Sequence, residues 1–293
     1  MKKFEVPYNF DEDLIKFYIK HTSYINFLYL PPFKEDLINT RSSIQSSSKG
    51  QCYMPATREE YEGHLKLIVR AGLRFVVLWQ SRDNIISRNL LEYYTNLGAI
   101  GFTIANDDNA KIIKEYNPEL IVICSLVQKL QHNIRNRDFS LYDYLILYYP
   151  FNRSLDALQE LMELKNKIVL MPNTMCHIEC PSFHHWFPQN INGFQPQIEC
   201  WVKEKTLDKS GFIFPEHLFL FDRFVSGYKL QGREYPTEAI KYLCHFYFKR
   251  EYYRDFINPF LNNIMAEKLF KLAHDKNVEE YYNIYSPKLI PFL

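Results

Sequence analysis

Eight short apolar runs recur along the chain, and segments of helical length separate most of them. The runs are rich in β-branched and aromatic residues, which favour strands. Most are apolar at consecutive positions, as expected for parallel strands that are buried on both faces. The predicted strands are Tyr24–Leu30, Phe75–Trp79, Gly101–Ala105, Leu120–Cys124, Tyr144–Tyr148, Ile168–Met171, Phe212–Phe214 and Tyr228–Leu230.

The segments between these runs have the periodicity and end signals of helices. A helix over Ser154–Leu164 has Asn152 or Ser154 as its N-cap, and prolines open the last two helices. The predicted helices are Thr57–Ala71, Ile86–Leu97, Asp107–Tyr116, Ser154–Leu164, Pro215–Phe221 and Pro236–Phe248.

The alternation of strands and helices, without an internal repeat, predicts the α/β class and a (β/α)8 TIM-type barrel over residues 1–250. An open, doubly wound parallel sheet is the alternative. Apolar positions across Phe256–Leu272 predict that residues 251–293 form a C-terminal helical extension packed on the barrel. With 47% hydrophobic residues, the chain can fill a core of this size.

Two loops that follow predicted strands are long, near residues 31–55 and 172–210. In a barrel, the loops after the strands carry the function. The second loop gathers Cys176, Cys180 and Cys200, and thiolates brought together on a loop suit an iron–sulfur cluster or a zinc ion. Cys52, in polar surroundings on the first loop, would reach the same rim as a fourth ligand. Cysteines that bind no metal are the alternative interpretation.

The other two cysteines read as core residues. Cys124 ends an apolar strand, and Cys244 shares a helix face with Ile240, Leu243 and Tyr247.

Charged and polar side chains near the metal loop are candidates for chemistry. His184 and His185 are adjacent, so one of them can face a metal; a structural role for both is the alternative. The last predicted strand carries Lys229 and delivers Arg233 just before a helix, where cations and helix amides favour an anion. We expect a carboxylate or phosphate ligand here, unless Arg233 pairs with Glu234 or Glu238.

Composition and common motifs exclude several classes of protein. With 35 Lys and Arg against 34 Asp and Glu, the formal charge of +1 argues against nucleic acid as a partner. No run is long enough to span a bilayer, and acids stand where a signal peptide needs apolar residues. Six unevenly placed cysteines do not predict a disulfide framework, which favours the reducing cytoplasm. Glycine-rich phosphate loops and the H-E-x-x-H and G-x-S-x-G motifs are absent.

The two informative stretches, in this order, resemble the collagenase-like peptidase family of unknown catalytic type. That family includes proteins of oxygen-independent ubiquinone hydroxylation and of transfer and ribosomal RNA hydroxylation. The matching residues are Asn173-x-x-Cys176-x-x-x-Cys180-Pro181 with His185, Phe214-Pro215-Glu216-His217-Leu218, Tyr228-Lys229-Leu230-Gln231-Gly232-Arg233, Pro236-Thr237-Glu238, and Ile104-Ala105-Asn106.

The resemblance implies a barrel with an oxygen-sensitive 4Fe-4S cluster and an oxygen-independent hydroxylase activity, with prephenate as the hydroxyl donor. Carried onto this chain, the cluster ligands become Cys52, Cys176, Cys180 and Cys200, with Asn173 at the cofactor. His185, Lys229 and Arg233 become the catalytic candidates, and the last two also hold the substrate's carboxylates. The substrate would be a small molecule or a peptide.

Two further functions fit the same residues. The first is a zinc-dependent hydrolase or peptidase, with Cys176, Cys180 and one of the two histidines as ligands and a water in the open position. The second is a non-catalytic partner subunit of an enzyme complex, since relatives work as pairs and aromatic surfaces bind proteins.

Overall fold

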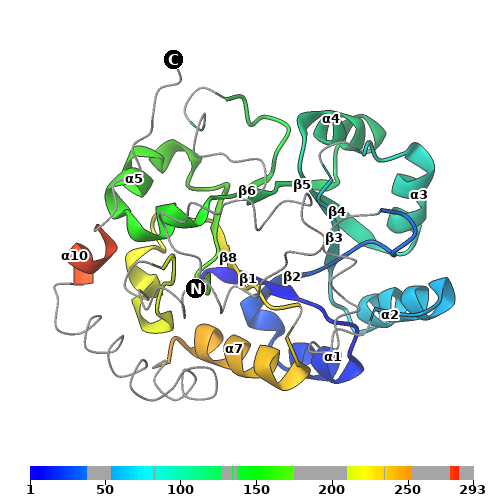
Figure 1. The fold of residues 1–293 in the computed structure, drawn as a ribbon, viewed down its shortest axis with the longest axis horizontal. Coiled ribbons are helices and arrows are strands. Elements are labelled where there is room, and N and C mark those ends of the chain that lie inside the picture. The colour runs from blue at the N-terminus through cyan, green and yellow to red at the C-terminus, as the bar shows by residue number, and fades with distance from the viewer. Residues whose placement is uncertain are drawn as a thin grey trace, which may run out of the picture.

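The computed structural model describes residues 1–37, 54–81, 84–126, 134, 137–174, 210–233, 235–251 and 278–283. Its eight parallel strands close into a barrel in chain order, because β1 pairs with both β2 and β8 (Figure 1). The strands are β1 Lys3–Pro7, β2 Ile25–Leu30, β3 Phe75–Trp79, β4 Ala99–Ile104, β5 Ile121–Cys124, β6 Tyr144–Ile146, β7 Ile168–Leu170 and β8 Gly227–Lys229. The predicted TIM-type barrel is confirmed, and the open sheet is excluded.

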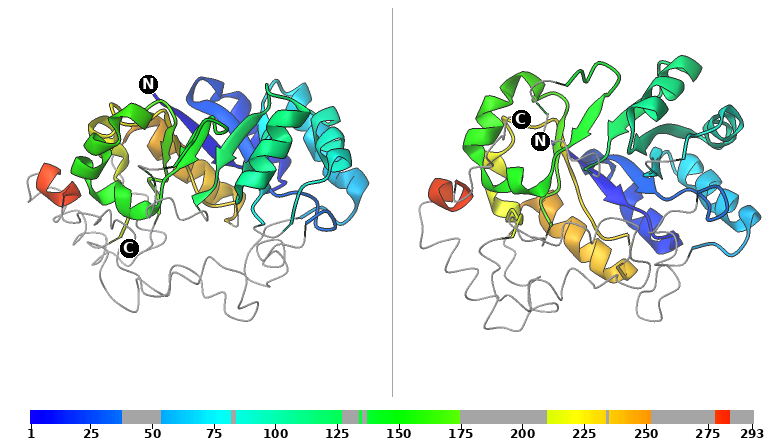
Figure 2. Two further views of the ribbon diagram at one scale, coloured as in Figure 1. Left: turned by 90° about the horizontal axis from the view of Figure 1, so that it is seen from above. Right: turned by 45° about the horizontal axis from the view of Figure 1, so that its top comes forward.

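Helices lie around the outside of the strands (Figures 1 and 2). They are α1 Glu12–Ile19, α2 Arg58–Arg70, α3 Arg88–Asn96, α4 Asp107–Tyr116, α5 Leu155–Glu160, α7 Thr237–Lys249 and the short α10 Val278–Tyr282. Short 3₁₀ helices add η1 Thr22–Tyr24, η5 Tyr149–Arg153, η6 Met162–Leu164 and η9 Pro215–Leu220. Side-chain N-caps begin several helices; of the two residues predicted for α5, Ser154 is the cap and accepts from the Ala157 N–H.

The prediction of the strands was wrong at two places. Phe212–Phe214 is not a strand: the Ile213 N–H donates to the Pro172 carbonyl, and the Ile213 carbonyl accepts from the Tyr247 hydroxyl. A barrel closed by eight paired strands leaves no edge for this segment to join. The missing member is β1, whose short run is interrupted by Glu5 and ends in a proline.

Aromatic packing shows which strand residues face outward. The Phe4 ring lies 5.5 Å from Tyr228 and 5.4 Å from Phe248 on α7, between the barrel and its helices. Because side chains alternate along a strand, the register partners Glu5 and Lys229 point into the barrel.

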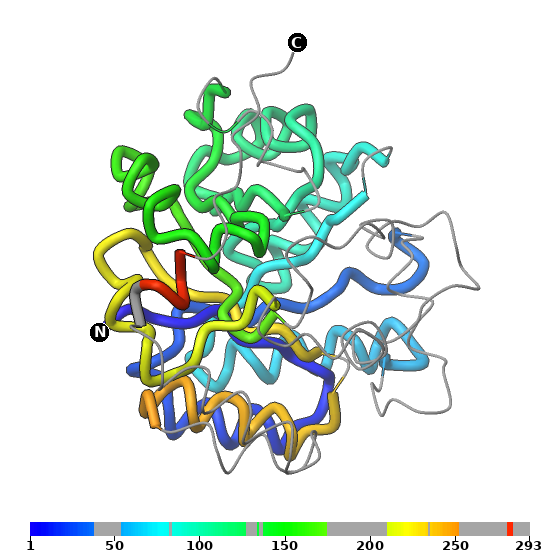
Figure 3. Tube along the Cα trace, turned by 60° about the vertical axis from the view of Figure 1, so that its left-hand side comes forward, coloured from blue at the N-terminus to red at the C-terminus, as the bar shows by residue number. Residues whose placement is uncertain are grey.

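Helix α10 packs on the barrel beside η5 and η9, where Figure 3 shows it next to the yellow segment. The Arg153 guanidinium lies 3.8 Å from the Tyr281 ring centroid and donates to the Tyr281 carbonyl at 2.8 Å. The Tyr282 hydroxyl lies 2.9 Å from the His217 Nδ1 atom. Residues 252–277 and 284–293, the rest of the predicted extension, lie outside the described residues. Among the described helices, none has the length and apolar character that a membrane span requires.

Candidate functional site

The exits of β7 and β8 are tied together at the carboxyl-terminal mouth of the barrel, where this fold places its active sites. The Asn173 amide donates to the Gln231 carbonyl at 3.0 Å and accepts from the Gln231 N–H at 2.9 Å. The Gln231 side chain in turn donates to the Thr174 hydroxyl at 2.7 Å. Asn173, predicted at the cofactor, therefore fixes the backbone that leads to Arg233.

Arg233 follows a glycine whose conformation few other residues adopt. Gly232 has φ +128°, and a Cβ there would meet the Tyr235 ring at 2.5 Å. The Arg233 side chain is buried at the mouth, with the residue 7% exposed. Of its two predicted acidic partners, Glu238 forms an ion pair with Lys241 at 2.7 Å, and Glu234 lies outside the described residues.

Lys229 forms a buried ion pair that the sequence analysis missed. Its ammonium lies 3.2 Å from the Glu5 carboxylate, with side-chain exposures of 6% and 3%. The same nitrogen lies 3.9 Å from the Tyr29 ring centroid. Burial raises the pKa of Glu5, and the charge of Lys229 opposes that rise. The signal available in the sequence was Glu5, an acid inside the apolar run of β1. Because the first and last strands of a closed barrel are neighbours, this acid could be expected to face Lys229 on β8.

The predicted ligands Cys52, Cys176, Cys180 and Cys200, together with His184 and His185, lie outside the described residues. The segments from which their loops leave are described. Both loops begin after the carboxyl ends of strands, β2 and β7, so they start from the end of the barrel that carries Arg233. The described residues contain no group of three or more His, Cys, Asp or Glu side chains that could hold a metal.

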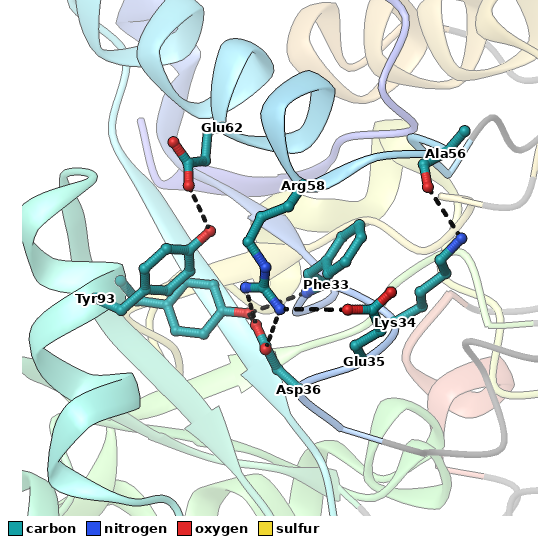
Figure 4. A network of polar contacts seen from close by, with 9 residues as sticks. Phe33, Lys34, Glu35, Asp36, Ala56, Arg58, Glu62 and Tyr93 are labelled. Carbon is teal, nitrogen blue, oxygen red and sulfur yellow. Dashed lines mark hydrogen bonds and ion pairs between the residues drawn. The ribbon is translucent and has the colours of Figure 1, made fainter.

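A network of charged and aromatic side chains closes the base of the first loop (Figure 4). Arg58, at the start of α2, donates twice to Asp36, at 2.7 and 3.1 Å, and lies over the Phe33 ring. The Tyr94 hydroxyl donates to the same carboxylate at 2.5 Å. Lys34 donates to the Ala56 carbonyl at 3.1 Å, a second link between the two ends of the loop.

The cysteines that the structure does describe are core residues, as predicted. Cys124 and Cys244 are both free and fully buried, and burial raises the pKa of each thiol. A thiol whose pKa is raised holds little thiolate, so neither is suited to bind metal.

The geometry thus defines an α/β barrel with two buried cations at the exit of its last strand. No family model matches the chain. Over 167 residues the chain is 28% identical to the uncharacterized protease MJ1657 of Methanocaldococcus jannaschii, a match that covers 52% of this chain and 50% of that protein. The chain therefore spans about half the length of this curated relative.

A solved structure shares the fold of this chain. The U32 peptidase Mk0906 matches with a TM-score of 0.50 and 13% identity, over 80% of this chain and 95% of that one. At this identity the match shows a shared fold. Together with the sequence relative, it confirms the predicted resemblance to the collagenase-like (U32) peptidases.

Proposed function

We propose that this chain is an enzyme that binds a carboxylate-bearing small molecule or peptide at the mouth of the barrel. The supporting observation is the pair of buried cations on one strand exit, Lys229 and Arg233. A cation removed from water attracts an anion more strongly than an exposed one. Prephenate, which carries two carboxylates, is the proposed hydroxyl donor.

The two cations have different surroundings and therefore different proposed tasks. The charge of Lys229 is balanced by Glu5, so this pair adds little net charge at the mouth. Arg233 lies nearer the opening, and its planar guanidinium matches a carboxylate at two points. In the proposal, Arg233 meets the substrate carboxylate, and Lys229 is the cation behind it.

The proposed cofactor is a 4Fe-4S cluster held by Cys52, Cys176, Cys180 and Cys200, with His185 beside it. When bound, such a cluster supplies electron transfer and an iron that can polarise a donor. Support comes from the thiol spacing and from the shared starting end of the two loops. The chain's own task is to hold the substrate's carboxylates close to the cluster and to exclude water.

Anaerobic purification with iron, sulfide and zinc analysis tests the cofactor. We expect a brown protein with about four irons per chain, the content of a four-iron cluster. Cys176→Ala and Cys180→Ala should each lose the iron. Cys244→Ala is the matched control: it removes a buried thiol from α7 and should keep the full iron content. Full iron in both loop variants would refute the ligand assignment.

A zinc-dependent hydrolase is the second candidate, favoured by the name of the relative, an uncharacterized protease. A colourless protein with about one zinc, the content of a single catalytic site, would support it. Stable co-purification with a second chain and no turnover alone would instead support a partner subunit.

A further inference from the structure

The exit of β8 lacks one backbone hydrogen bond that a regular parallel ladder would supply. The Leu230 N–H donates to the Glu5 carbonyl at 2.9 Å. In a parallel pair, the N–H two residues further along β1 would then donate to the Leu230 carbonyl. That residue is Pro7, which has no N–H. The Leu230 carbonyl therefore needs another donor.

The donor is a side chain on β2, which lies on the far side of β1 from β8. The Tyr29 hydroxyl on β2 donates to the Leu230 carbonyl at 2.6 Å, passing over Pro7 inside the barrel. The bond is buried, so its loss would leave a carbonyl without water to replace the partner.

The Tyr29 ring is itself held in place by the buried ion pair. Lys229 lies 3.9 Å from the ring centroid, and Glu5 holds Lys229 at 3.2 Å. Lys229 is the last residue of β8 and Leu230 follows it, so one tyrosine contacts two successive residues at the end of the strand, through its ring and through its hydroxyl. Asn173 then holds the next residue, Gln231, on both sides.

We infer that Tyr29 is a positioning residue for the anion site, acting through the Leu230 carbonyl on the segment Gln231–Arg233. The inference rests on the proposed function, in which Arg233 binds a substrate carboxylate. Tyr29 touches no ligand in this account. It compensates for the missing donor of Pro7 and so fixes the direction in which the chain leaves β8 toward Gly232 and Arg233.

Tyr29→Phe is the direct test, because it removes the hydroxyl and keeps the ring over Lys229. Tyr18→Phe is its matched control: Tyr18 is also buried, and its hydroxyl donates at the same 2.6 Å to a carbonyl, that of Pro7. Two readouts apply to the anaerobically purified full chain. They are hydrogen exchange of the segment 228–235 and calorimetric titration with prephenate.

We expect Tyr29→Phe to speed exchange in this segment and to weaken prephenate binding about tenfold, which corresponds to about 1.4 kcal/mol. Tyr18→Phe should lower the melting temperature about as much as Tyr29→Phe does. It should change neither the exchange of segment 228–235 nor the affinity for prephenate. A rescue completes the test: Pro7→Ala restores a backbone N–H opposite Leu230, so Pro7→Ala/Tyr29→Phe should recover both exchange protection and affinity.

Equal behaviour of the two tyrosine variants in exchange and affinity would overturn the inference, as would the absence of rescue. Its failure is distinguishable from failure of the proposed function. If the wild type binds prephenate and Arg233→Met does not, while Tyr29→Phe binds normally, only the inference is wrong. If the wild type binds no prephenate, both are overturned.

Discussion

Replacing Lys229 by methionine would remove the cation that faces the buried Glu5 carboxylate. Breaking a buried pair at one partner costs about 3–5 kcal/mol near neutral pH. The cost has a pH dependence whose sign follows from Glu5, because burial raises its pKa above the ordinary value of 4.5. Folding then favours the protonated acid. The contribution of Glu5 to stability is therefore fully present below pH 4.5 and is lost as the pH rises through its folded-state pKa.

The size of the effect follows from the same linkage. Without Lys229, the pKa of Glu5 rises further, and each pH unit above 4.5 costs up to about 1.4 kcal/mol. We expect Lys229→Met to lose little stability near pH 5, where Glu5 can fold protonated, and about 3–5 kcal/mol near pH 8, the usual cost of a buried charge left without its partner. Urea denaturation at the two pH values measures both.

Two control variants separate the pair from general damage. Glu5→Met/Lys229→Met removes both charges and should abolish the additional pH dependence. Lys16→Met breaks an exposed ion pair with Asp13 on α1 and should leave the difference in stability between pH 5 and pH 8 unchanged. A loss in Lys229→Met that is the same at pH 5 and pH 8 would refute the reasoning.

Three further predictions concern other parts of the molecule. Asp36→Asn should cost about 2 kcal/mol in urea denaturation, because Arg58 and the Tyr94 hydroxyl lose a charged acceptor; an unchanged midpoint would contradict this. Burial raises the pKa of Glu216 to about 7 from 4.5, so its contribution to stability falls as the pH rises between these values, by at most about 3 kcal/mol. Glu216→Gln should remove that part of the pH profile, and an identical profile would be contrary evidence. Arg153→Met should release α10, seen as faster proteolysis near Tyr281; equal cleavage rates would disprove the contact's role.

Strands with continuous apolar runs were predictable because burial on both faces leaves a clear signal. Phe75–Trp79 matches β3 in both bounds, and Asp107–Tyr116 matches α4. The failure at β1 has a physical cause: its charge points inward, where Lys229 compensates it, and a single chain segment does not show its partner. Phe212–Phe214 has the composition of a strand, but its backbone bonds go to Pro172 and Tyr247 instead.

The site was predictable in its residue types and not in its contacts. The sequence placed Asn173 and Arg233 after strands that the predicted strand Phe212–Phe214 would separate. The structure makes those strands neighbours and ties their exits together through Gln231. Neither Glu5 nor Tyr29 could be found without knowing that β1, β2 and β8 adjoin. The cysteine ligand set remains a prediction, because those positions lie outside the described residues.

Calorimetric titration of the anaerobically purified chain with prephenate tests the central claim most directly. The informative comparison is between the wild type, Arg233→Met and the control Arg223→Met, which removes an exposed arginine from the segment between η9 and β8. The account predicts saturable binding by the wild type and the control, and a loss of at least about tenfold in Arg233→Met, as expected for a charged hydrogen-bonded contact. Equal binding by all three proteins, or none by the wild type, would contradict it.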